Sequence, residues 1–165
     1  MTSANSIIDQ KNQIEQAEIS YRLEPLVPIF QEALKLWEGH WAETEVAYRT
    51  APLNPDYKQL TRLEELGWSR YYTARIGDKL VGHLYFIVYQ NRHTQTKTAV
   101  EDFFYFLPEA RLGTAAIKLL RFAVADLKSE DCDQVGMSSK LTGKKDIDPL
   151  LRRVGFRHVA NFYVI

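Results

Sequence analysis

The segment from residue 99 to residue 127 restricts the fold more than any other part of the sequence. Residues 99–107 form an extended run that is largely apolar after Glu101 and Asp102, which is typical of a strand buried on both faces. Pro108 ends the run, and a helical stripe of apolar residues follows it: Ala115, Ala116, Leu119, Leu120, Ala123, Val124 and Leu127. A buried strand that leads into a long amphipathic helix predicts a sheet covered by a helical layer.

The rest of the chain supplies further helices and strands. In chain order, the patterns predict helices at 26–41 and 57–66, strands at 71–76 and 79–89, a short strand at 135–140, a helix at 150–154 and a last strand at 156–165. Asp56 and Asp148 stand at expected helix N-caps, and Gly155 at an expected left-handed helix end. Only Gly77-Asp78 separates the first two strands, which favours a hairpin. The prediction is a single α/β (α+β) domain with a mixed sheet.

Composition limits the kind of ligand that the chain binds. The 165 residues contain 21 basic and 21 acidic side chains, so no histone-like nucleic-acid binder is indicated, and we predict no nucleic-acid partner. The balance hides an asymmetry. Residues 1–66 carry 6 basic and 11 acidic side chains, whereas residues 67–165 carry 15 and 10. An anionic ligand would therefore prefer the second part of the chain.

Cysteine and histidine usage indicates neither disulfides nor metal. The single cysteine, Cys132, cannot form an internal disulfide, and the four histidines lack paired spacing, so we predict no metal site. The start of the chain is not that of a signal peptide, and no apolar run is long enough to span a membrane. The expectation is a cytoplasmic protein without a membrane segment, in which residues 1–20 are an extension, either frayed or an appended helix.

The turn between the apolar strand and the long helix has the chemistry of an anion site. The first backbone N–H groups of a helix have no partner within the helix, and the helix dipole is positive there. Small residues at Gly113, Thr114, Ala115 and Ala116 would let a phosphate approach, and Arg111 can add a charge-assisted contact. A plain strand-to-helix turn would explain the same residues equally well.

These residues resemble a known family. The apolar strand, Pro108-x-x-Arg111, the small-residue loop, the long helix and a late Gly155-Phe156 are similar to the acyl-CoA-binding core of the GNAT acyltransferase superfamily. The family loop is Gln/Arg-x-x-Gly-x-Gly/Ala. With Arg111 in its first position, Thr114 replaces the first glycine. With Gly113 and Ala115 in the small positions, Ala110 replaces the Gln/Arg.

The resemblance implies a fold and a cosubstrate. It implies that residues 21–165 form one acyl-CoA-binding domain with a mixed, mostly antiparallel central sheet flanked by helices. It further implies acetyl-CoA as cosubstrate, with the backbone near the end of the strand beside the thioester and the loop around the pyrophosphate. The implied binding residues are Phe106, Leu107, Arg111, Leu112, Gly113, Thr114, Ala115 and Ala116.

The implied reaction is transfer of an acetyl group to an amine, which needs a base to deprotonate that amine. Glu101 and Asp102 are the candidate bases, and because they point to opposite faces of a strand, at most one faces the cleft. A solvated strand start would explain the same two carboxylates. Leu151 occupies the position where many family members have a tyrosine acid. Leucine cannot donate a proton, so Ser138, Ser139 or Tyr163 would have to serve, or the thiolate leaves unaided.

A second function therefore stays open. Residues 51–56, Leu80-Val81-Gly82-His83 and Glu101-Asp102 are especially similar to GNAT proteins of tailed bacteriophages. That likeness implies an alternative, a catalytically weak or inactive protein that acts by binding a host protein partner.

Two further groups of residues allow both a functional and a structural interpretation. Aromatic and acidic residues of the first helices predict an acceptor wall for a cationic amine or a protein lysine, although core packing explains them equally: Trp37, His40, Trp41, Tyr48, 52–56 and Tyr72. Basic residues late in the chain either lie on a solvated surface or contact CoA phosphates: Lys140, Lys144, Lys145, Arg152 and Arg153. The sequence indicates neither the acceptor nor the oligomeric state.

Overall fold

The computed structural model describes residues 18–45, 51–111, 113–140 and 146–161. A five-stranded sheet runs through the molecule in the order β1-β2-β3-β4-β5. Its strands are β1 (Ile19–Leu23), β2 (Ser69–Ile76), β3 (Lys79–Gln90), β4 (Lys97–Phe106) and β5 (Gln134–Gly136). All neighbouring pairs are antiparallel except β4 and β5, which are parallel. The mixed, mostly antiparallel sheet expected from the sequence is confirmed.

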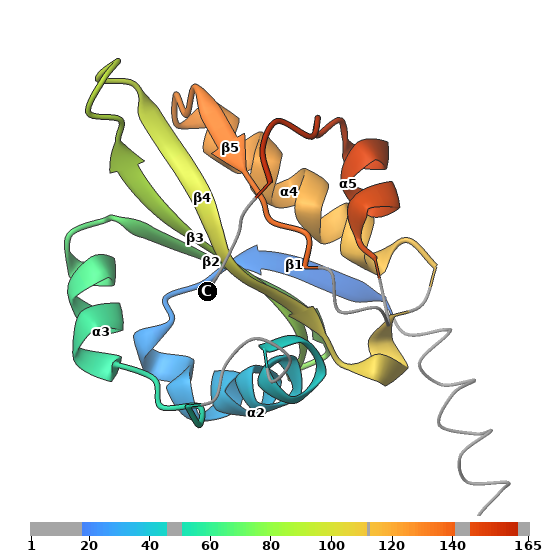
Figure 1. Cartoon of the computed structure of the whole chain (residues 1–165). Coiled ribbons are helices and arrows are strands. Elements are labelled where there is room, and N and C mark those ends of the chain that lie inside the picture. Colours follow the sequence, from blue (N-terminus) through green and yellow to red (C-terminus); the bar gives the residue numbers. More distant parts are fainter. Residues whose placement is uncertain (1–17, 46–50, 112, 141–145, 162–165) are drawn as a thin grey trace, which may run out of the picture.

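Helices cover both faces of this sheet (Figure 1). On one face lie α2 (Phe30–His40) and α3 (Tyr57–Glu65), and on the other lie α4 (Ala115–Ser129) and α5 (Asp148–Val154). A 3-10 turn at Val27–Ile29 precedes α2, a π-helical turn at Trp41–Glu45 continues it, and a 3-10 turn at Pro108–Ala110 lies between β4 and α4.

On the α4 face, the helix contributes aliphatic side chains, which pack against sheet residues that include the rings of Tyr72, Phe86 and Phe106. Leu119, Leu120, Ala123 and Leu127 of α4 are fully buried against the sheet. Burying a leucine side chain contributes roughly 1.5–3 kcal/mol to folding. The helical stripe seen in the sequence is therefore the side of α4 that meets the sheet.

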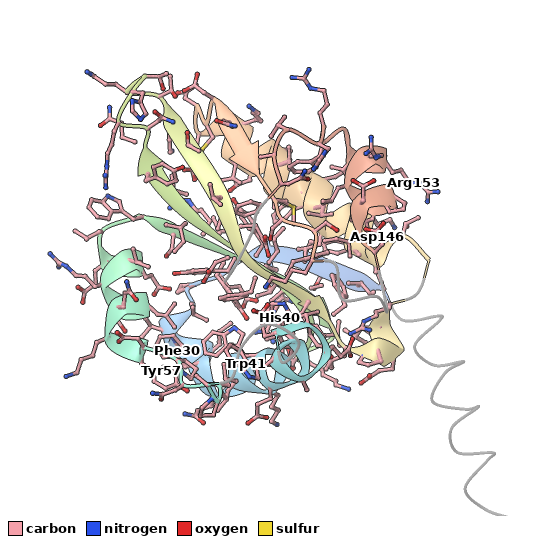
Figure 2. All side chains as sticks on the ribbon, viewed as in Figure 1. Phe30, His40, Trp41, Tyr57, Asp146 and Arg153 are labelled. Carbon is pink, nitrogen blue, oxygen red and sulfur yellow. The ribbon has the colours of Figure 1, made fainter. Side chains whose placement is uncertain are left out.

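The α2 face is packed with aromatic side chains. Its core includes Trp37, Tyr71, Tyr85 and Tyr105. Phe30 of α2 and Tyr57 of α3 meet edge to face with ring centroids 5.0 Å apart, which joins the two helices. Figure 2 shows Phe30 and Tyr57 together with His40 and Trp41 on this side of the sheet, away from α5.

Several local predictions are confirmed and others are wrong. The Asp56 carboxylate accepts a hydrogen bond from the Gln59 N–H at 3.0 Å and caps α3 as expected. Gly155 ends α5 with φ +106°, also as expected. Asp148, in contrast, is the first residue of α5 rather than its N-cap, which is Ile147.

The prediction also missed one strand and placed another wrongly. No strand was expected before residue 71, yet β1 pairs with β2 along its whole length. The last strand was expected at 156–165, but residues 156–161 form no strand and 162–165 lie outside the described residues. The extension expected at residues 1–20, frayed or an appended helix, falls mostly on residues 1–17, which lie outside the described part. Within that part, no helix has both the length and the apolar character needed to cross a lipid bilayer.

Candidate functional site

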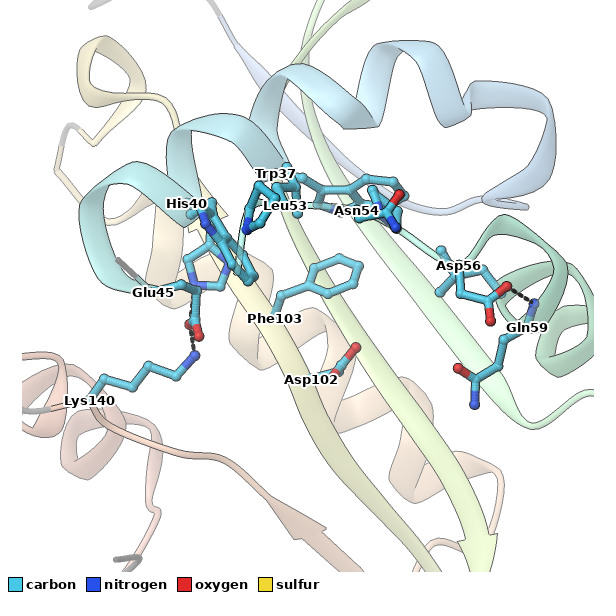
Figure 3. Close-up of a pocket in the computed structure, with 14 residues that line it drawn as sticks. Trp37, His40, Glu45, Leu53, Asn54, Asp56, Gln59, Asp102, Phe103 and Lys140 are labelled. Atoms are coloured by element: carbon cyan, nitrogen blue, oxygen red, sulfur yellow. Dashed lines mark hydrogen bonds and ion pairs between the residues drawn. The ribbon is translucent and has the colours of Figure 1, made fainter. Parts of the chain in front are cut away.

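A cavity of about 340 Å³ lies on the α2 face, between the end of α2, the segment before α3, and β4 (Figure 3). This volume is at the lower end of the range for small-molecule sites. Its lining is aromatic and polar: Trp37, His40, Trp41, Glu45, Pro52, Leu53, Asn54, Pro55, Asp56, Gln59, Leu60, Asp102, Phe103 and Lys140. Most of the acceptor wall expected from the sequence is therefore present in one place.

A β-bulge in β4 decides which carboxylate faces this cavity. The register pairs Phe86 with Glu101 and Tyr85 with Phe103, so Asp102 is the additional residue of the bulge. As a result the neighbouring residues Asp102 and Phe103 both line the cavity, although they are adjacent in a strand (Figure 3). Sequence patterns could not reveal the bulge, because the extra residue has no local signature.

Glu101 is engaged elsewhere and does not line the cavity. Its Oε2 accepts hydrogen bonds from the Ser138 hydroxyl at 2.8 Å and from the Ser138 N–H at 3.2 Å, in the segment that follows β5. Burial raises the pKa of Glu101 to about 7, against the opposing effect of these hydrogen bonds. Of the two candidate bases, the structure thus places only Asp102 at the cavity.

Stacked aromatic rings form the floor of the cavity. Phe103 stacks on Tyr85 with centroids 4.8 Å apart and an interplanar angle of 6°. The indole of Trp37 meets Phe103 edge to face at 5.6 Å. Such offset and edge-to-face pairs fix ring positions, so the wall beside Asp102 is rigid.

The polar end of the cavity is built by the π-helical turn after α2. Glu45 on this turn is only 5% exposed and forms an ion pair with Lys140 (Figure 3). His40 Nε2 lies 3.7 Å from the same Glu45 oxygen. Burial, together with the charge of Lys140, lowers the pKa of His40 to about 4, so its imidazole is uncharged at neutral pH.

Arg111 is held inside the protein rather than presented to a phosphate. Its Nε donates to the Phe106 carbonyl at 2.8 Å, and its Nη2 donates to Glu43 Oε1 at 2.8 Å. The same Glu43 oxygen accepts from the Tyr105 hydroxyl at 2.9 Å, and the guanidinium lies 4.9 Å from the Tyr105 ring centroid. Arg111 therefore ties the end of β4 to the π-helical turn.

The small-residue loop itself leaves room beside its backbone. Gly113 has φ +54°, which favours glycine, and a Cβ added there would have open space around it. Thr114 precedes α4 without capping it through its side chain, and Ala115 and Ala116 form the first turn. Leu112 lies outside the described residues. At the end of β4, the Leu107 N–H already donates to the Val81 carbonyl at 2.9 Å.

Other expected residues lie away from the cavity. Leu151 is 7% exposed and packs into the α4 core, and Tyr72, expected in the acceptor wall, donates instead to Asp126 of α4. Ser138 bonds Glu101, as above, and the Ser139 hydroxyl donates to Asp146 at 3.1 Å. Tyr48, Lys144, Lys145 and Tyr163 lie outside the described residues.

The late basic residues are separated in space. Arg152 forms an exposed ion pair with Asp148 within α5, and Arg153 lies on the exposed side of the same helix (Figure 2). Lys140 alone of the described members of this group reaches the cavity. Among the described residues, no three His, Cys, Asp or Glu side chains are grouped so as to hold a metal ion.

The sequence analysis missed Glu43 and Glu45. Both lie on the π-helical turn, which the helical spacing of 26–41 did not extend to include. Their ion-pair partners, Arg111 for Glu43 and Lys140 for Glu45, are 68 and 95 residues away in the sequence. Only the tertiary fold brings these charges together.

Comparison with known proteins identifies the fold. No family model and no curated protein matches the sequence. Solved structures do match. A ribosomal-protein-alanine N-acetyltransferase from Brucella melitensis biovar Abortus 2308 superposes with a TM-score of 0.71 at 17% identity, over 90% of this chain and 97% of that one. The chain has the GNAT fold.

Two further GNAT-fold structures contain ligands. A predicted acetyltransferase from Clostridium acetobutylicum with acetyl-CoA gives a TM-score of 0.66 at 15% identity, over 90% of this chain and 96% of that one. The structure of AAC(6')-Iy with the bisubstrate analogue CoA-S-monomethyl-acetylneamine gives a TM-score of 0.68 at 12% identity, over 90% of this chain and 97% of that one. At these identities the likeness establishes the fold, and function has to be argued from the site.

Proposed function

We propose that this chain is an acyltransferase that moves an acetyl group from acetyl-CoA to an amine. The observation that carries the proposal is the bulge of β4, which places Asp102 and Phe103 together on the wall of a cavity in a GNAT fold. The structural neighbours with bound acetyl-CoA and CoA analogue support acetyl-CoA as the donor. The cavity then receives the acceptor.

The donor site in this proposal is the start of α4 and the end of β4. The first N–H groups of a 15-residue helix, with open space at Gly113, suit a pyrophosphate. Phe106, Leu107 and the loop 111–116 are its binding residues. Arg111 acts there by holding the Phe106 carbonyl through its Nε, while its Nη2 donates to Glu43.

Asp102 is the proposed base. Transfer requires a neutral amine, so a carboxylate on the acceptor side must take a proton from the ammonium form. Asp102 lines the cavity and Glu101 does not. Three carboxylates in the lining, at Glu45, Asp56 and Asp102, also favour a cationic acceptor.

Position 151 supplies no acid for the leaving group, because it is a leucine whose side chain packs in the core. The CoA thiolate therefore departs without a tyrosine acid there. A thiol has a pKa of about 8.5, so its anion is a good leaving group near neutral pH and needs little assistance. The absence of that acid limits the rate less than loss of the base would.

Acetyl-CoA binding measured by calorimetry tests the donor site. We expect micromolar affinity for the native chain and a loss of at least about tenfold, equivalent to ~1.4 kcal/mol, in Gly113→Asp, which puts negative charge at the phosphate position. Gly113→Asn is the matched control, since Asn has similar size, accepts a positive φ and carries no charge. It should retain most of the affinity.

One observation favours the second candidate function, a GNAT-fold protein that acts by binding a host protein. Leu151 stands where many family members have a tyrosine, so that proton donor is missing. The Leu107 N–H and the Phe106 carbonyl are already hydrogen-bonded to groups of the chain itself. If the native chain fails to bind acetyl-CoA at millimolar concentration, the acyltransferase proposal is wrong and this second function takes its place.

A further inference from the structure

The cavity already contains a primary amine. Lys140 belongs to the segment after β5, yet its side chain reaches the cavity wall formed by α2 and β4 (Figure 3). It shares this lining with Asp102 and Phe103, the two bulge residues. Among the described residues of the lining, Lys140 is the one lysine.

Glu45 holds that amine in place. Lys140 Nζ forms an ion pair with Glu45 Oε1, and the Glu45 side chain is 7% exposed whereas that of Lys140 is 31% exposed. The ion pair with a buried carboxylate restricts the lysine amine to a small region, whereas the amine of a solvated lysine moves freely. The amine is thus fixed at the cavity and still reachable from it.

Burial and the ion pair act on this amine in opposite directions, because burial favours its neutral, nucleophilic form whereas Glu45 favours its ammonium form. Partial burial lowers the pKa of Lys140 from its ordinary 10.5. Glu45 and Asp102 are carboxylates in the same lining, and His40 beside Glu45 is uncharged at neutral pH. Either carboxylate can take a proton that the ammonium gives up.

We propose that Lys140 is a self-acetylation site of this chain. The proposal rests on the acyltransferase function proposed above. Lys140 transfers one proton to a carboxylate of the cavity, and its neutral Nζ attacks the thioester carbonyl of acetyl-CoA. The N–C bond forms, the C–S bond breaks, and CoA leaves as a thiolate, which takes up the second proton that the nitrogen gives up as it becomes an amide. The products are the Nε-acetyl amide of Lys140 and free CoA.

Acetylation changes the charge of the cavity. The amide is neutral, so the ion pair with Glu45 is lost and the lining becomes more acidic. The charge of Lys140 is also one cause of the low pKa of His40, so that pKa rises on acetylation. Titration of the His40 imidazole by NMR is therefore a second readout of the modification.

Peptide mapping by mass spectrometry tests the proposal. The purified full chain is incubated with acetyl-CoA, and the acetylation of Lys140 is compared over time with that of the exposed Lys58 and Lys79 in the same sample. We expect Lys140 to react at least about tenfold faster, because its amine is positioned. At saturating acetyl-CoA, the rate constant should not depend on protein concentration, since the bound acetyl-CoA and Lys140 are on the same molecule.

Variants separate this proposal from the donor site. Gly113→Asp, which is expected to weaken acetyl-CoA binding, should slow the acetylation of Lys140 by the same factor at subsaturating acetyl-CoA, whereas the slow labelling of Lys58 and Lys79 by free acetyl-CoA should be unchanged. Glu45→Gln should slow Lys140 alone. Lys140→Arg keeps a cation at Glu45 and should leave no rapidly labelled site.

The outcomes distinguish the two proposals. If the native chain binds acetyl-CoA by calorimetry but acetylates Lys140 no faster than Lys58 and Lys79, self-acetylation is wrong and the acyltransferase proposal is unaffected. If it does not bind acetyl-CoA, the acyltransferase proposal fails and self-acetylation fails with it. The native-chain comparison needs no variant, so a misfolded variant would not affect the conclusion.

Discussion

The two faces of the sheet differ in the side chains that cover them and in the cavity that one of them contains. The α4 face is covered by aliphatic residues of the helix such as Leu120 and Leu127, which are fully buried against the sheet. The α2 face is filled by aromatic rings and keeps a cavity of about 340 Å³ beside buried polar groups, among them His40 and Glu45.

The difference shows that, in this small domain, the residues that mainly stabilise the fold and the residues that line the candidate site lie on opposite faces of the sheet. Close-packed apolar side chains stabilise the fold and leave no room for a ligand. Rigid rings can surround a cavity without collapsing into it, and buried charged groups cost stability unless they are paired. We therefore expect changes on the α4 face to alter folding and changes on the α2 face to alter activity.

The largest expected effect is on the α2 face. Asp102→Asn should lower turnover by about 100-fold or more, because a general base typically contributes factors of this size. Free CoA released from acetyl-CoA with a panel of primary amines measures it, and acetyl-CoA affinity should stay unchanged. Glu101→Gln is the matched control and should change turnover by less than about threefold. Equal losses in both variants would show that the bulge does not select the base.

The next effect belongs to the α4 face. Leu120→Ala should reduce the free energy of unfolding by about 2–5 kcal/mol, because it leaves a void in a close-packed core. Urea denaturation measures the change, and the folded protein should keep its turnover. Leu60→Ala, at the rim of the cavity and only half-buried, should cost clearly less. A reversal of this order would contradict the contrast between the faces.

A smaller effect is expected at the C-terminal end of α4, where Glu130 meets cations of β2 and β4. Glu130 accepts hydrogen bonds from Arg70 Nε at 2.9 Å and from Lys97 Nζ at 2.9 Å, and the Arg70 and Lys97 cations hold its pKa at about 2. Glu130→Gln should cost about 1–2 kcal/mol at pH 7, a value reduced by solvent screening.

The pH dependence of this contribution has a definite sign. Because the pKa of Glu130 is lower in the folded protein than its ordinary 4.5, its stabilisation is complete above about pH 4.5 and is lost as the pH falls toward 2. Native protein and Glu130→Gln should therefore converge in unfolding free energy over that range. A difference that stays constant with pH would mean that the contribution is not ionic.

The smallest effect is expected at an exposed ion pair. Lys79 Nζ lies 3.4 Å from Glu109, and their side chains are 62% and 42% exposed. Lys79→Met should change the free energy of unfolding by less than about 0.5 kcal/mol, because water screens the pair. Thermal unfolding at low and high salt checks this, and a loss above 1 kcal/mol would place Lys79 among the structural charges.

The periodic parts of the sequence predicted their own structures well. The stripe of α4 and the Gly77-Asp78 hairpin depend on neighbours a few residues away, so their patterns are complete within the sequence window. β1 was missed because an edge strand of five residues has little pattern of its own and is defined by pairing with β2, about 50 residues later. The strand expected at 156–165 is wrong over its described part, 156–161, because a strand-like pattern forms a strand only where a partner strand pairs with it.

The site divides in the same way. The sequence by itself determined the strand, the glycine loop, the helix that follows, and a choice between two adjacent carboxylates, because these depend on local spacing. Tertiary structure decided which carboxylate faces the cavity, through a bulge set by pairing with β3. It also decided that Arg111 binds Glu43 and that Lys140 binds Glu45, because Coulomb attraction and burial act between groups that only the fold brings within a few ångströms.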